Sequence, residues 1–372
     1  MGIYVHIPFC RSKCFYCGFY SVASDRLQEA FIQALCAEID LRKDYTGSRE
    51  AETLYFGGGT PSSLSLPQLR RVMDRLEEVY SIVPGAERTI EVNPEDLDAG
   101  RLQGWKVLGF NRLSIGVQSF RDDLLKNMNR RHTSRQVTEG IRIAKEQGFK
   151  NISIDLIIGL PGQSLEVLQQ DLRQALLLDV DHISVYMLSV DAGSVWEKQY
   201  RKGLFCPPSE EELARKYEFV VQRLKNAGYE HYEISNFARN GKYSVHNTSY
   251  WQQKPYIGFG PAAHSYDLSS RQWNISNLKN YIDDLDKGIL NFEREELREV
   301  DKYNEYIMTS LRTMWGIKEE ELRRKYGFAW GHFVCQMERF LKLGRAVESR
   351  GTYTLTETGW LISDTIFSEL FL

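Results

Sequence analysis

The chain has 372 residues, of which 42% are hydrophobic and 26% charged, and its formal net charge is -3. This is the composition of a globular protein that is long enough to bury a large core and to form more than one domain. The small negative charge disfavours nonspecific binding to nucleic acid, and no apolar run reaches the length of a membrane span.

The first residues, "MGIYVHIPF", are too few and too uncharged for a secretory signal. We therefore expect a cytoplasmic location and no nucleic-acid partner, while a peripheral membrane association would leave no obligatory trace. Three of the six cysteines are clustered, which in a reducing compartment indicates metal or redox chemistry rather than disulfides.

Short apolar runs alternate with amphipathic stretches over the first 240 residues. The runs are "IYVHIP", "TLYFGGG", "RTIEVNP", "RLSIGVQS", "ISIDLIIG", "HISVYML" and a weaker "YEHYEIS". Helical patterns lie between them, at residues 25–43, 67–80, 134–147, 165–178 and 210–226. This alternation predicts an α/β fold whose first domain, residues 1–240, is a partial (βα)6-type barrel.

The pattern changes over residues 241–372, which we predict to be a second, α+β domain. An aromatic, Gly- and Pro-rich stretch is followed by helical patterns near 278–287, 299–314 and 333–343, and "AVESRGTYTLTETG" is typical of a hairpin. Helices that end in a hairpin indicate a winged-helix-like module. Such modules often bind DNA, but no strongly basic helix is present here.

The strongest chemical signal is the spacing Cys10-x3-Cys14-x2-Cys17 directly after the first strand. Three unrelated buried thiols are one interpretation, and a zinc site completed by His6 is another. Soft thiolates gathered in one loop are instead typical of iron–sulfur clusters. Three ligands for four irons leave one iron open to an exogenous ligand, so the spacing favours a catalytic 4Fe–4S cluster.

Polar residues recur where the predicted strands end. "GGGTP" follows the second strand, Glu91 lies at the end of the third, Gln118 ends the fourth and Asp155 lies in the fifth. In βα barrels, functional side chains gather at the carboxyl ends of several strands. Consecutive glycines there also let a ligand approach backbone N–H groups closely, although a glycine run can be merely a tight turn.

Together these motifs resemble the radical S-adenosylmethionine (SAM) enzymes. In order along the chain, "YVHIPFCRSKCFYC", "GGGTP", "EVNPE", "GVQSF", "NRRH", "DLIIGLPGQ", "HNTSYW" and "YIGFGPAAHS" are similar to the oxygen-independent coproporphyrinogen III oxidases and their relatives. The resemblance covers most of the chain. It implies reduction of SAM by a cluster, with release of a 5′-deoxyadenosyl radical.

The resemblance also implies site residues. Cys10, Cys14 and Cys17 would bind the 4Fe–4S cluster, and Tyr4 and Phe15 would lie beside it. The remaining matched positions would hold SAM: Gly58, Gly59 and Thr60 at its methionine amino group, and Glu91, Gln118, Arg130 and Asp155 at the rest of the molecule. Acids suit its ammonium and ribose hydroxyls, and Arg suits its carboxylate.

Two departures separate the chain from the oxidases of this family. The oxidases carry a further cysteine two residues beyond the third ligand, where this chain has Phe19, and an N-terminal extension with no counterpart here. Both favour the heme-chaperone branch, which implies heme as a third ligand, acceptor hemoproteins and an electron donor as partners. His246, with His264 as a weaker candidate, would ligate the heme. The alternative is a coproporphyrinogen III oxidase or another radical SAM tetrapyrrole enzyme.

Overall fold

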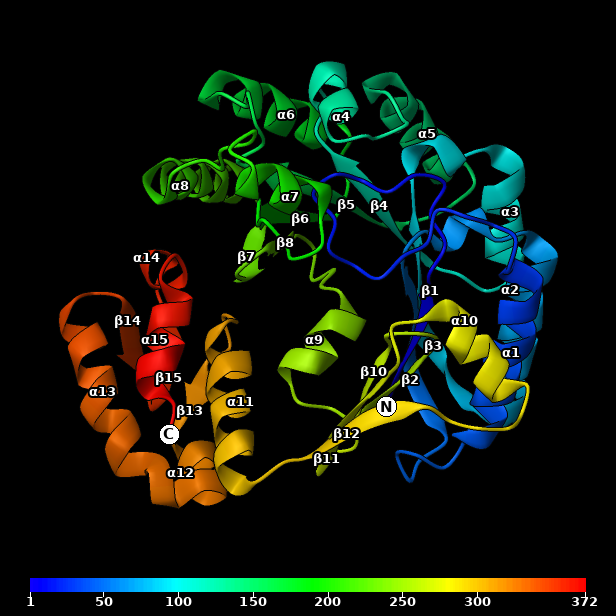
Figure 1. Ribbon diagram of the computed structural model, residues 1–372. Helices are drawn as coiled ribbons and strands as arrows, with labels where there is room; N and C mark the ends of the chain where they lie inside the picture. Colours follow the sequence, from blue (N-terminus) through cyan, green and yellow to red (C-terminus); the bar gives the residue numbers. More distant parts are fainter.

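A twelve-stranded sheet forms the largest part of the computed structural model, which describes all 372 residues (Figure 1). Its central strands lie in chain order: β1 (Gly2–Ile7), β2 (Glu50–Gly58), β3 (Ser81–Val92), β4 (Arg112–Gln118), β5 (Asn151–Ile158) and β6 (His182–Met187). Each neighbouring pair among them is parallel. The predicted partial (βα)6 barrel is therefore confirmed.

Amphipathic helices cover the outer face of these strands (Figure 1). They are α1 (Gln28–Leu41), α2 (Leu66–Val79), α3 (Ala99–Val107), α5 (Ser134–Glu146), α6 (Leu165–Leu177) and α8 (Glu210–Asn226), while α4 (Asp122–Asn127) and α7 (Val195–Arg201) pack beside the loop after β1. Local sequence fixes where several of them begin. Ser65 and Thr133 cap α2 and α5, and each forms a capping box with the glutamine three residues later.

The two edges of the sheet are antiparallel additions. β7 (Glu230–Glu233) and β8 (Asn236–Ala238) pair with each other, and β8 pairs with β6. The run "YEHYEIS" is thus a strand, but it is no further parallel unit. On the other side, β9 (Tyr256–Phe259) is parallel to β1 and is followed by β10 (His264–Tyr266), β11 (Ser270–Asn274) and β12 (Phe292–Glu296). Because β12 and β7 remain unpaired at the ends, the barrel stays open.

A core of 55 buried residues lies between this sheet and its helices, and a separate core of 19 lies in the C-terminal module. The module contains α11 (Glu299–Leu311), α12 (Glu319–Tyr326), α13 (Trp330–Lys342), α14 (Glu357–Trp360), α15 (Ser363–Leu370) and a three-stranded sheet of β13 (Ile317–Lys318), β14 (Ala346–Ser349) and β15 (Thr352–Leu355). β14 and β15 form the predicted hairpin. The large sheet runs on to Glu296, so the boundary at residue 240 stays a prediction.

Two further helices complete the structure. α9 (Val245–Trp251) lies between the barrel and the C-terminal module, and α10 (Leu278–Leu285) packs beside α1 (Figure 1). No helix of the protein combines the length and the apolar character that crossing a bilayer requires. The cysteine-bearing loop after β1 passes over the carboxyl ends of the central strands, and this position makes that end of the barrel the candidate site.

Candidate functional site

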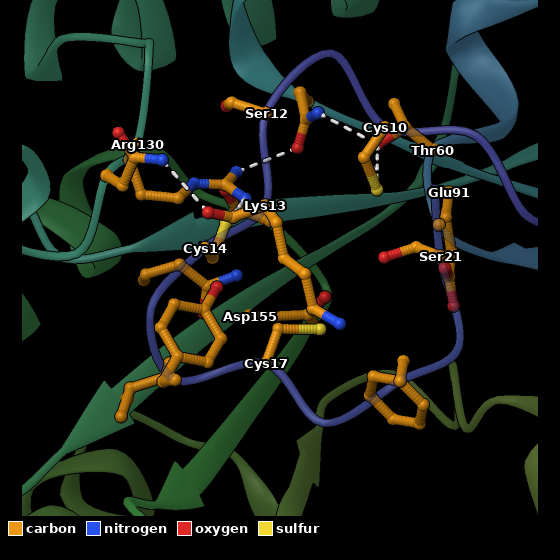
Figure 2. Close-up of a pocket in the computed structure, with 18 of the residues that line it drawn as sticks. Cys10, Ser12, Lys13, Cys14, Cys17, Ser21, Thr60, Glu91, Arg130 and Asp155 are labelled. Atoms are coloured by element: carbon orange, nitrogen blue, oxygen red, sulfur yellow. Dashed lines mark hydrogen bonds between the residues drawn. The ribbon is translucent and has the colours of Figure 1, made fainter. Parts of the chain in front are cut away.

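One cavity of about 420 Å³ lies at the carboxyl ends of the parallel strands, under the loop after β1 (Figure 2). Ten of the predicted site residues line it: Cys10, Cys14, Cys17, Gly58, Gly59, Thr60, Glu91, Gln118, Arg130 and Asp155. They come from the loop after β1, from β2 and the turn that follows it, from β3, β4 and β5, and, for Arg130, from the segment between α4 and α5. Parallel strands that end at one edge therefore bring together residues far apart in the sequence.

The three cysteine side chains face this cavity from different points of the loop (Figure 2). The Thr60 hydroxyl donates a hydrogen bond to Cys10 Sγ at 3.5 Å, and Arg130 Nη1 donates one to Cys14 Sγ at 3.5 Å. Burial raises the pKa of the Cys10 thiol, and it raises that of Cys17 to about 11. These two thiols, Cys10 and Cys17, therefore remain neutral unless a bound cation compensates the charge of their thiolates.

Backbone hydrogen bonds anchor the loop to its surroundings. Phe15 N donates to Met128 O at 3.1 Å, and Phe15 O accepts from Trp196 N at 2.9 Å. The side-chain amide of Asn129 adds a hydrogen bond to Lys13 O at 2.9 Å. Each of these partners lies in or next to α4 or α7, so the barrel itself holds the loop between the cysteines in place.

Crowding explains the glycine run after β2. Gly58 has a φ of +104°, and a Cβ there would lie 2.5 Å from the ring of His6. A Cβ on Gly59 would lie 2.8 Å from the carbonyl oxygens of Ile7 and Phe9. The two glycines thus bring the chain against the start of the cysteine-bearing loop after β1, and this packing role accompanies any contact with a ligand.

Two carboxyl groups face the cavity from neighbouring regions of the sheet. Glu91 accepts hydrogen bonds from the Tyr55 hydroxyl at 2.8 Å and from Gly58 N at 3.1 Å. Burial, opposed by these two donors and reinforced by the nearby Asp155, raises the pKa of Glu91 to about 7. Burial also raises the pKa of Asp155. A cationic ligand in the cavity would lower both pKa values and so favour the ionised form of each group.

Gln118 and Arg130 lie where β4 ends. Gln118 has a φ of +67°, at an irregularity in the pairing of β4 with β5. Such strain in a residue other than glycine is typical of functional sites. Arg130 donates to Gly116 O at 2.6 Å, which fixes its guanidinium against the strand. Both side chains are therefore held at the cavity by the backbone of β4.

Tyr4 and Phe15 do not line the cavity. The Tyr4 hydroxyl is 3.1 Å from His6 Nδ1, while Phe15 packs in a small apolar cluster with Trp196. His6 Nε2 is 3.0 Å from Tyr20 O, so both nitrogens of His6 are engaged. No three His, Cys, Asp or Glu side chains converge closely enough to hold a single metal ion. This arrangement disfavours the zinc site with His6, whereas the cysteines of a cluster each bind a different iron.

The structure places His246 outside the cavity, on α9 and buried against β2. Its Nδ1 is 2.7 Å from Thr53 Oγ1, its Nε2 is 2.7 Å from the Tyr250 hydroxyl, and its ring stacks on Tyr55. Neither nitrogen is free to bind iron in this conformation. His264 is exposed and stacks on Trp273. Heme ligation by either histidine stays a prediction.

Several cavity residues carry no predicted role. They include Asn93 and Glu95 after β3, Ser114 in β4, Ser21 and Lys13 in the loop, and Tyr186 at the end of β6. Asn93 and Glu95 lie in the same "EVNPE" segment as Glu91, so the position of this segment after a strand was a usable signal. Lys13 and Ser21 carried no such signal, because loop geometry decides which of its side chains face inward.

Comparison with known proteins agrees with these motifs. Residues 4–175 match the radical SAM superfamily. The heme chaperone HemW of Bacillus subtilis strain 168 is 38% identical over 369 residues, which cover 98% of this chain and 97% of the relative. HemW of Escherichia coli K12 is 31% identical over 100% of this chain and 98% of its own length.

A solved structure shares the fold. Coproporphyrinogen III oxidase (HemN) from Escherichia coli, described as a radical SAM enzyme, superposes with a TM-score of 0.86. The alignment covers 99% of this chain and 89% of that one, at 24% identity. The chain therefore carries a radical SAM domain and belongs to the HemW family.

Proposed function

We propose that the protein is a heme chaperone that binds a 4Fe–4S cluster, SAM and heme and transfers heme to hemoproteins such as respiratory enzymes. The similarity to HemW along nearly the whole chain, at 38% identity, carries this proposal. Phe19 supports it, because an apolar ring stands where the resemblance implies a further cysteine in the oxidases. Its side chain is 68% exposed at the edge of the cavity.

The residues around the cavity fit the two cofactors. Cys10, Cys14 and Cys17 supply three thiolates to a cluster, and no fourth cysteine lines the cavity. When bound, the cluster and SAM would supply one-electron chemistry. The protein's own part is to orient the cofactors and to neutralise the charged groups of SAM. Glu91 and Asp155 suit an ammonium group and ribose hydroxyls, and the guanidinium of Arg130 suits a carboxylate.

Heme binding requires a further conformational step if His246 is the ligand. Its ring would have to leave Thr53 and Tyr250 and emerge from a site where it is 1% exposed. His264 would need no such step. We keep His246 as the candidate that the family resemblance implies, with His264 as the exposed alternative. Acceptor hemoproteins, an electron donor and a cytoplasmic location complete the proposal.

Heme titration of the reconstituted protein tests this function. We expect a Soret band that saturates with one heme per chain and shifts when an apo-hemoprotein takes the heme. His246→Ala should abolish the band if His246 is the axial ligand, and His264→Ala should abolish it if the exposed alternative is the ligand. A band that neither variant changes would contradict both ligand assignments, and absence of heme binding by the intact protein would contradict the function.

A further inference from the structure

Asn93 connects two of the cluster cysteines through a chain of hydrogen bonds. Its Nδ2 donates to Thr60 Oγ1 at 3.3 Å, and the Thr60 hydroxyl donates in turn to Cys10 Sγ. On its other side, Asn93 Oδ1 accepts from Arg130 Nη2 at 2.8 Å, while Arg130 Nη1 donates to Cys14 Sγ. Cys10, Cys14, Thr60 and Arg130 all face the same cavity (Figure 2).

The direction of every hydrogen bond in this chain is fixed once the two sulfurs are cluster thiolates, because a thiolate can only accept. Arg130 can only donate, so the atom of Asn93 that faces it must be the oxygen. Thr60 has one hydroxyl hydrogen, which it donates to Cys10, so it must accept from the amide nitrogen of Asn93. An amide provides one acceptor and one donor on adjacent atoms, and an aspartate or an aliphatic residue at position 93 would break the chain.

The backbone holds Asn93 in place for this task. It follows the last residue of β3 with an extended conformation and precedes the short helical turn Pro94–Asp96. Arg130 is fixed independently by Gly116 O. The amide, carried at the end of β3, therefore bridges Thr60, which follows β2, and Arg130, which is held on β4, and its orientation is determined before any cofactor binds.

We propose that Asn93 is a positioning residue that holds Thr60 and Arg130 against the sulfurs of Cys10 and Cys14 and thereby sets the reduction potential of a cluster bound there. The inference rests on cluster binding by these cysteines. Donors to ligating sulfurs stabilise the extra negative charge of a reduced cluster, so they raise its potential. Hydrogen bonds that polarise one another in a chain stabilise the charge on a sulfur more strongly than isolated hydrogen bonds do.

The test is redox titration of the reconstituted 4Fe–4S protein, followed by optical absorption and electron paramagnetic resonance. We expect Asn93→Ala to bind as much iron as the unmodified protein and to show a more negative midpoint potential. Asn111→Ala is the matched control, because the Asn111 amide also donates once and accepts once, to Ala86 O and from Arg88 N, at the amino end of β4. It should leave the potential unchanged.

A second comparison tests whether Asn93 acts through its partners. In a Thr60→Val, Arg130→Leu background the chain is already broken, so adding Asn93→Ala should shift the potential by less than half of its effect in the unmodified protein. An equal shift in both backgrounds would overturn the proposal. So would an unchanged potential in the single variant.

Loss of iron also has a defined meaning. If Asn93→Ala cannot bind the cluster while the Thr60→Val, Arg130→Leu protein can, Asn93 acts by another route and the proposal is wrong. If both lose the cluster, the chain is needed to bind the cluster rather than to tune its potential, and the proposal is wrong as well. Failure of the unmodified protein to bind iron would instead contradict the proposed function. The iron content of that protein alone distinguishes this outcome from a failure of the proposal on Asn93.

Discussion

Burial favours the protonated thiols of Cys10 and Cys17 in the absence of metal, and a compensating positive charge would favour the thiolates that bind iron. Cys10 and Cys17 both have pKa values raised by burial. Iron ions supply that charge when a cluster binds. Each cysteine is therefore needed for the cluster, although the barrel that carries the loop does not depend on it.

Replacing Cys14 with Ser tests this consequence. We expect reconstituted Cys14→Ser to lose the visible absorption and most of the iron of the cluster, while its circular dichroism spectrum stays unchanged. Cys206→Ser is the matched control, because Cys206 is exposed and lies outside the cavity. Full iron content in Cys14→Ser would show that the assignment of three thiolate ligands is wrong.

Glu91 makes the stability of the cofactor-free protein depend on pH. Its pKa in the folded protein is about 7, above the usual value for a glutamate, because burial favours the neutral form. The contribution of neutral Glu91 to the stability of the folded protein is complete below the ordinary glutamate pKa. It is lost as pH rises through about 7, a change on the order of 3 kcal/mol in the free energy of unfolding. Chemical denaturation at pH 5 and pH 8 should show that the free energy of unfolding falls more between these values in the unmodified protein than in Glu91→Gln. Equal losses would contradict this role for burial.

SAM binding should respond to pH in the opposite sense. A cationic ligand favours ionised Glu91, so affinity should rise between pH 6 and pH 8 in the reconstituted protein and rise less in Glu91→Gln. Isothermal titration at both values measures the difference. An equal change of SAM affinity with pH in the unmodified protein and in Glu91→Gln would show that Glu91 does not contact the cation.

The sequence predicted ten of the 29 residues that line the cavity, because the ends of parallel strands must meet at one edge of a sheet. Glu91, Gln118 and Asp155 were found in this way. The environment of His246 could not be predicted, since its partners Thr53 and Tyr250 depend on how α9 packs against β2. The bridging role of Asn93 likewise depends on the exact distance between two strand ends.

At the scale of elements, the glycine turn after β2 fixes the distance between that strand and the loop of β1. Gly58 and Gly47 both have positive φ, but a Cβ meets the His6 ring only at Gly58, and nothing lies within 4 Å of one at Gly47. A side chain at Gly47 would therefore meet backbone strain alone, whereas one at Gly58 would meet both backbone strain and crowding.

Alanine at these two glycines gives a matched pair. We expect Gly47→Ala to lower the free energy of unfolding by about 1 kcal/mol, the cost of the backbone conformation alone. Gly58→Ala adds overlap with a buried ring and should cost roughly 3 kcal/mol or more, with loss of cluster binding. Denaturation curves measure both. Equal costs would contradict the role of crowding.

Periodicity predicted the parallel elements well because each βα unit buries its own apolar face. α2 and α5 lie within one residue of their predicted bounds. The antiparallel pairing of β7 with β8 and the short helix α9 were not foreseen, because their positions depend on contacts between the barrel and the C-terminal module rather than on local pattern.

At the scale of the whole molecule, the barrel and the C-terminal module are joined by backbone and by charge. Ile234 N donates to Arg312 O at 3.1 Å, and Met314 N donates to Tyr232 O at 2.9 Å. The Arg312 guanidinium lies 3.1 Å from the buried Glu233 carboxylate and 4.1 Å from the centre of the Trp251 ring on α9. Movement of α9, which release of His246 requires, would therefore disturb this connection.

One anaerobic assay on the reconstituted protein tests the central claim, that this fold delivers heme rather than making its precursor. The protein is supplied with SAM, reductant and coproporphyrinogen III in one reaction, and with heme and an apo-hemoprotein in a parallel one. We predict no catalytic formation of protoporphyrinogen and measurable transfer of heme to the acceptor. Repeated turnover of coproporphyrinogen III without heme transfer would contradict the account.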